Sequence, residues 1–114
     1  MYSWRHEFHR QLKQTRTDIM FELFETSSFL FDAKVQLHGY PPTREFPRCP
    51  VHTVQELRKN LKSEDIPIDI DHCVTLVQDK QCPDWKDTVT LERIEQAQVT
   101  LLGVLRVMNN KYEE

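Results

Sequence analysis

The pentapeptide RCPVH places Cys49 and His52 three residues apart in a proline-rich stretch. Thiolate and imidazole are donors that zinc prefers, and a structural zinc site needs four ligands in tetrahedral arrangement. The second pair would have to combine Cys73 or His72 with Cys82. Cys73 and Cys82 are nine residues apart, a wider spacing than the usual zinc knuckle has. We therefore expect no bound metal, and a zinc-stabilised module remains an alternative.

Some of the same side chains are also of types that serve in catalysis. A cysteine beside a histidine can give an activated thiolate, but no glycine turn near Cys49 supplies an oxyanion site. Asp69 and Asp71 are two carboxylates of the kind that hold magnesium. We favour the other explanation of these two residues, which is capping of a helix together with a favourable charge at its N-terminus. The expectation is a non-enzymatic protein with no catalytic residues and no cofactor.

Length and composition bound the class of protein. The 114 residues predict a single domain spanning 1–114, with 39% hydrophobic and 29% charged residues, as in ordinary globular proteins. No apolar run approaches the ~18 residues of a membrane span, and the first ten residues do not look like a secretory signal. Three cysteines are an awkward number for a disulfide framework. A cytoplasmic protein with no membrane association is the simplest expectation.

The elements that must position these residues are mainly helical. An apolar stripe at helical spacing marks an N-terminal helix, formed by Trp4, Phe8, Leu12, Ile19 and Leu23. Residues 26–38 fit both a helix and a strand, and we favour the helix because Gly39 and the prolines after it form a helix stop. Short strands around 29–37 or 66–70 remain an alternative.

Three further helices follow from caps and periodicity. Thr53 and Glu56 form a capping box that predicts a helix over 54–62. A second helix is expected to begin near Asp69, because Ile70, Cys73, Val74 and Val77 share one face. The last is expected to run from Pro83 to about residue 110, with an apolar stripe of Leu91, Ile94, Ala97, Leu101, Leu102, Leu105 and Met108. Together these elements predict a compact helical bundle of four to five helices.

Two surfaces are candidates for partner binding. The N-terminal helix carries a basic strip, and such a strip suits an acidic protein patch or nucleic-acid phosphates; its members are Arg5, His9, Lys13 and Arg16. The last helix has a second low-charge face, which includes Trp85, Val89, Gln96, Val99, Gly103 and Val107. Such a face either lies in the core or touches a partner.

The row Val99, Gly103 and Val107 recurs every four residues, and Gly103 would let another helix approach closely. The leading hypothesis is a small protein-binding regulator, inhibitor or adaptor that acts through helical surfaces and binds another protein or itself. The alternative is a nucleic-acid-binding regulator that uses the basic strip.

Overall fold

The structure is a computed structural model that describes the backbone of residues 4–42 and 50–112 and the side chains of residues 14–42 and 50–111. Over these residues it contains helices and no strand, so the predicted mainly helical bundle is confirmed. The helices are α1 (Trp4–Leu37), α2 (Pro50–Ser63), α3 (Asp71–Lys80), α4 (Trp85–Thr88) and α5 (Leu91–Tyr112). The ambiguous residues 26–38 are helical except for the last, and 66–70 form an irregular connection.

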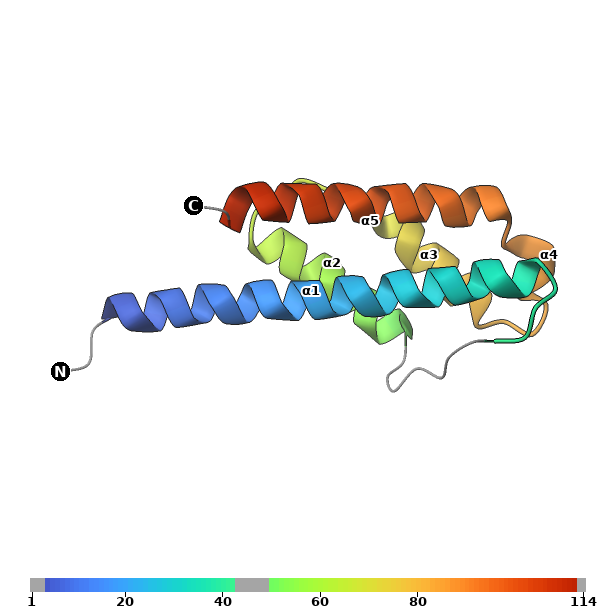
Figure 1. Cartoon of the computed structure of the whole chain (residues 1–114), viewed down its shortest axis with the longest axis horizontal. Helices are drawn as coiled ribbons and strands as arrows, with labels where there is room; N and C mark the ends of the chain where they lie inside the picture. The colour runs from blue at the N-terminus through green and yellow to red at the C-terminus, as the bar shows by residue number, and fades with distance from the viewer. Residues whose placement is uncertain (1–3, 43–49, 113–114) are drawn as a thin grey trace.

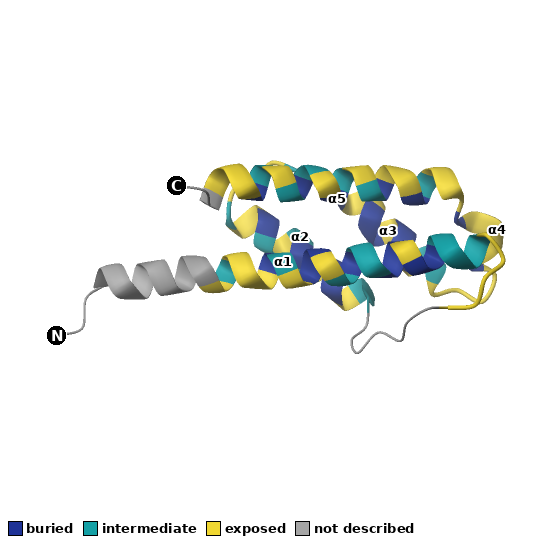
Figure 2. Cartoon of the chain, viewed as in Figure 1, coloured by how far each residue is buried: buried dark blue, intermediate teal, exposed yellow. Residues whose placement is uncertain are grey.

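The two long helices, α1 and α5, run side by side in opposite directions (Figure 1). α2 packs against α1, and α3 bridges the remaining space by contacting both α2 and α5. The core lies where these four helices meet, and Figure 2 shows buried residues on the inward side of each. Its largest fully buried side chains are Ile19, Leu30, Leu57, Leu61, Ile70, Leu76, Ile94 and Met108. The stripes predicted for the first helix and for α3 therefore face the core wherever the structure describes them.

The first helix ends just before Gly39, as the sequence predicts. Gly39 has a φ of +90°, and its N–H donates to the carbonyl of Gln36 while the N–H of Tyr40 donates to that of Val35. This pair of bonds is a Schellman motif, in which glycine occupies the left-handed position without a Cβ penalty. α2 ends in the same way around Asp65, which takes a φ of 55° although it is not glycine. Its neighbour Ile66 donates to the carbonyl of Leu61 and is buried.

The start of α2 differs from the expectation. The helix begins at Pro50, so Thr53 is a buried residue inside the helix and not its N-cap. Proline suits the first helical position, since its missing N–H would have no partner there and its φ is already helical. Consequently His52, expected in a loop, belongs to the first turn of α2 and is exposed.

The last helix is interrupted and not continuous from Pro83. Val89 has an extended backbone with ψ of 121°, which separates the short helix α4 from α5. Thr90 then caps α5: its Oγ1 accepts a hydrogen bond of 3.2 Å from the N–H of Arg93. The break turns Trp85 and Val89 into the core, so these two do not belong to an outer face of α5.

Candidate protein-binding surface

The outward side of α5 carries a row of four residues spaced i, i+4, i+7 and i+11. This outer row consists of Glu95, Val99, Leu102 and Arg106. The spacing places all four on one side of a helix, the pattern of a seam between paired helices. The side chains at its centre are apolar yet open to solvent, because Val99 is 68% exposed and Leu102 is 56% exposed. Glu95 and Arg106, at the two ends, are also exposed.

The buried face of α5 differs from the one predicted from the sequence. The periodicity predicts Leu102 in the buried stripe, and this is wrong: the structure buries Leu101 and Val104 and turns Leu102 outward. Leu105 is only half-buried, and Leu91 lies at the surface. Apolar residues occur at so many positions of this helix that periodicity alone cannot say which of two neighbours faces the core. The apolar residues of α5 that are not buried in the core form the candidate surface.

Gly103 lies beside the outer row and makes no close contact within the described chain. A Cβ built on it would meet no atom within 4 Å apart from its own local helix backbone. Val107 is half-buried and packs against the core. The expected row of Val99, Gly103 and Val107 is therefore split, with Val99 at the surface and Val107 turned inward. Glycine inside a helix makes the helix less stable than alanine would. No close contact between α5 and another described part of the same chain offsets this loss of stability.

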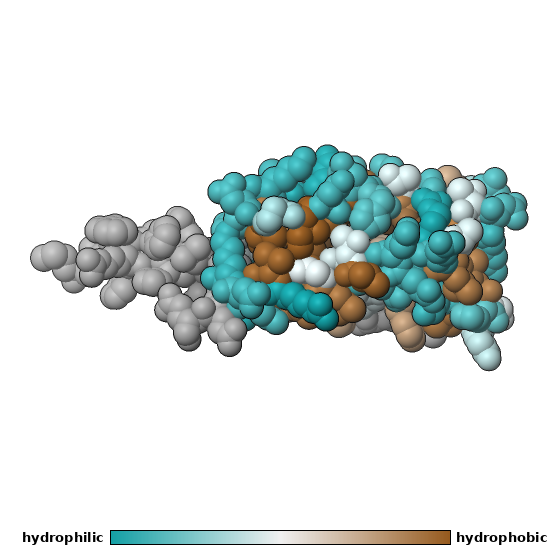
Figure 3. Space-filling model, turned by 90° about the horizontal axis from the view of Figure 1, so that it is seen from above, coloured by the Kyte–Doolittle hydropathy of each residue, from teal (hydrophilic) through white to brown (hydrophobic). Residues whose placement is uncertain are grey.

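An apolar pocket of about 320 Å³ adjoins the outer row between α1 and α5. It is lined by Leu23 and Ser27 from α1 and by Gln98, Leu101, Leu102 and Leu105 from α5. Figure 3 looks down on the side where α5 lies and shows hydrophobic side chains gathered there, bordered by hydrophilic ones. Leu102 belongs both to this pocket and to the outer row, so the two form one continuous apolar area.

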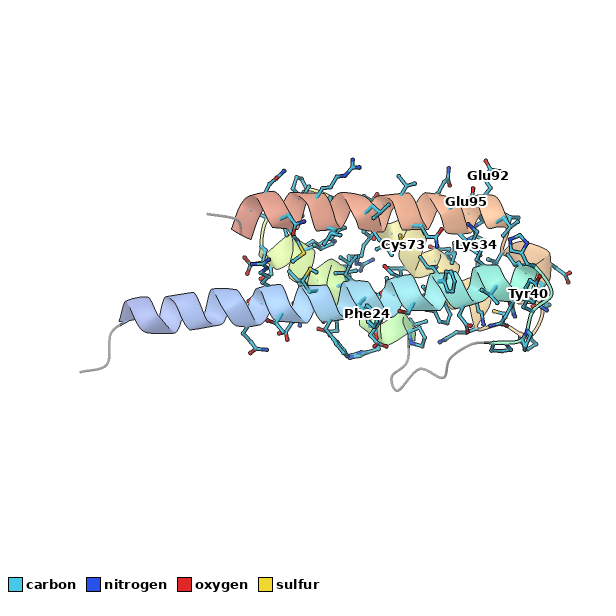
Figure 4. All side chains as sticks on the ribbon, viewed as in Figure 1. Phe24, Lys34, Tyr40, Cys73, Glu92 and Glu95 are labelled. Carbon is cyan, nitrogen blue, oxygen red and sulfur yellow. The ribbon has the colours of Figure 1, made fainter. Side chains whose placement is uncertain are left out.

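Most charges along α5 divide by sign, and the exception is Arg93 in the first turn, which forms an ion pair with Asp79 of α3. Glu92 and Glu95 lie in its N-terminal half, and Glu92, in the first turn, also suits the helix dipole. The Oε1 atom of Glu95 is 3.5 Å from the Nζ atom of Lys34 on α1, a surface ion pair that Figure 4 shows between the two long helices. Arg106 and Lys111 lie in the C-terminal half. The outer row is thus acidic at one end, apolar in the middle and basic at the other.

The basic strip of the first helix is only partly described. Arg5, His9 and Lys13 lie outside the described side chains, and Arg16 is exposed on α1. Arg16 borders a hollow with Thr17, Met20, Phe21 and Phe24, the last two of which are exposed aromatic residues. Sequence reasoning missed this aromatic face because Phe21 and Phe24 fall outside the apolar stripe of α1. The binding of nucleic acid by the strip stays a prediction.

The cysteines and histidines do not converge in the described part of the chain. Cys73 is buried in α3, its Sγ atom 3.6 Å from the Nε2 atom of His72. Burial, and secondarily the charge of Asp69, raises the pKa of the Cys73 thiol to about 12. The thiol is therefore protonated near neutral pH, and the pair does not supply a thiolate nucleophile. Cys82 is exposed, and Cys49 lies outside the described residues. No group of three or more metal-binding side chains forms among the described residues.

Comparisons with known proteins add no identification, since no family model, no curated protein and no solved structure matches the chain. Among the described helices, none combines the length and the apolar character needed to cross a membrane.

Proposed function

We propose that this chain is a small protein-binding regulator, inhibitor or adaptor that uses the outward side of α5 to bind another polypeptide. The observation that carries the proposal is the exposure of Val99 and Leu102 at the centre of a helix whose opposite side is fully packed. Leucine and valine exposed singly are common on protein surfaces. Here they adjoin each other and continue into an apolar pocket, which is the pattern of an interaction surface.

The surface is suited to a helix as the bound element. A helix presents apolar anchors at i, i+3, i+4 and i+7, and it can lay them along a neighbouring helix. The open position at Gly103 leaves room for the partner's backbone or for a long side chain. The rim of the apolar area carries Glu95 and Arg106, which would set the orientation of the partner more than the affinity.

A photo-crosslinking amino acid at position 99 tests the proposal in cells of the source organism. We expect a covalent adduct at position 99 that disappears when Leu102→Glu is added to the same chain. The matched control is the same crosslinker at Gln55, an exposed residue of α2, where no adduct is expected. Equal labelling at positions 99 and 55, or labelling that Leu102→Glu leaves unchanged, would contradict the proposed function.

A further inference from the structure

We infer that the outward side of α5 binds a second copy of this chain, in a two-fold pair in which the two α5 helices run antiparallel. The inference rests on the proposed function and names its partner. It starts from the order of the outer row, which reads acid, apolar, apolar and base along Glu95, Val99, Leu102 and Arg106. A sequence of this kind is complementary to itself when it is reversed.

The register follows from that order. A two-fold axis midway between Val99 and Leu102 places Val99 of one chain against Leu102 of the other. The same axis places Glu95 of each chain against Arg106 of its copy, so two ion pairs flank the apolar centre. All of these contacts are generated by one symmetry operation, as in the closed two-fold pairs that dominate protein oligomers.

A parallel pair is disfavoured by the same charges. It would place Glu95 against Glu95 and Arg106 against Arg106, and like charges held face to face are repulsive. The 4–3–4 spacing of the outer row is also the spacing of left-handed helix pairs, in which flanking charges set partner choice and orientation. Because each chain contributes few apolar side chains, the pair should be weak and concentration-dependent, as small interfaces are.

The structure leaves this side of α5 accessible. Val99 and Leu102 are more than half exposed, and α1, α2 and α3 pack against the other sides of the helix or against each other. The Lys34 ion pair holds Glu95 at the edge of the outer row without covering it, because the Glu95 side chain remains 60% exposed. One carboxylate can accept hydrogen bonds from two cations, so Lys34 and the arginine of the second chain can share it.

Sedimentation velocity of the full chain, from about 1 µM to about 1 mM, gives the test. We expect the mass to rise from that of one chain, 13.7 kDa, to that of two. Arg106→Glu should weaken the pair at least about tenfold, because it opposes Glu95 with a second carboxylate. The control is Lys59→Glu, an equal charge change at an exposed residue of α2, which should leave association unchanged.

Reversal of both charges gives the decisive variant. Glu95→Arg with Arg106→Glu restores complementarity and should restore the pair, in a Lys34→Gln background that avoids repulsion from the neighbouring lysine. Circular dichroism of each variant establishes that it is folded. Val99→Gln, which favours the helix but removes the apolar contact, is a second test and should also weaken the pair.

Three outcomes would overturn the inference: a wild-type chain that keeps the mass of one copy at every concentration, an Arg106→Glu variant that associates normally, or a folded double reversal that does not associate. A one-copy mass combined with crosslinking of position 99 to a different protein rejects the second copy and leaves the proposed function standing. A one-copy mass without specific crosslinking rejects both.

Discussion

Asn60 of α2 donates hydrogen bonds from its Nδ2 atom to both carboxylate oxygens of Glu22 of α1, at 3.2 and 2.9 Å. Glu22 is buried, so its carboxylate depends on protein donors in place of water. Asn60→Ala should lower the free energy of unfolding by roughly 1–3 kcal/mol, the cost of depriving a buried acceptor of a partner. Denaturant unfolding measures the change. Asn110→Ala, at an exposed position of α5, is the matched control. An equal loss of unfolding free energy in both variants would contradict the stabilising role of Asn60.

The core face of α5 gives a second prediction. Leu101 is buried, and Leu101→Ala should cost roughly 2–5 kcal/mol. Leu105 lies beside the same stripe but is half-buried and lines a pocket, so Leu105→Ala should cost clearly less. Thermal unfolding of both variants compares them. If the two losses are equal, the orientation of α5 described above is wrong.

Gly103 gives a third prediction, which separates stability from association. Since an added Cβ meets no neighbour, Gly103→Ala should stabilise the folded monomer by up to about 1 kcal/mol through better helix propensity. The measurement is unfolding at low protein concentration, where the chain is monomeric. A loss of stability in this variant would mean that α5 is closely packed at position 103.

The buried thiol gives a fourth prediction, on alkaline pH. The pKa of Cys73 rises from 9.0 to about 12 on folding, so above pH 9 the unfolded chain releases this proton while the folded chain keeps it. The contribution of Cys73 to stability is therefore present below pH 9 and declines as pH rises from about 9 to 12. Cys73→Ala should lack this part of the alkaline loss. Identical pH profiles of the two proteins between pH 8 and 11 would contradict the prediction.

The helical class, the stop at Gly39 and the core face of α3 were predictable, because each depends on residues close in sequence. Gly39 fits the left-handed position of a Schellman motif, and the stripe of α3 has no competing face. The break at Val89 was missed, since Thr90 lacks the glutamate three residues later that would complete a capping box. The start of α2 was placed too late, although Pro50 carried a signal for it.

The candidate surface was predictable only in part. Val99 and Gly103 were identified as belonging to a low-charge side of the last helix. Leu102 was assigned to the core, because three consecutive turns of α5 offer apolar residues on both sides of the true stripe. Which of them is buried depends on where α1 and α3 lie, and that is a tertiary property. The self-complementary order of Glu95, Val99, Leu102 and Arg106 becomes visible only once the outward side is known.

Disulfide trapping between two singly substituted chains tests the antiparallel pairing most directly. One chain carries Glu95→Cys and the other Arg106→Cys, both with Cys49→Ser and Cys82→Ser, while the buried Cys73 remains. In the mixed pair, the second contact between Arg106 and Glu95 stays intact.

The account predicts that the mixed 95–106 disulfide dominates under mild oxidation. A two-fold antiparallel pair holds the two 95 positions roughly 16.5 Å apart along the helices, because they are offset by eleven residues at about 1.5 Å each. This separation is too large for a disulfide. Dominant 95–95 and 106–106 products would show a parallel pair. A yield no higher than that of Gln55→Cys chains would show that the outward side of α5 does not bind a second copy.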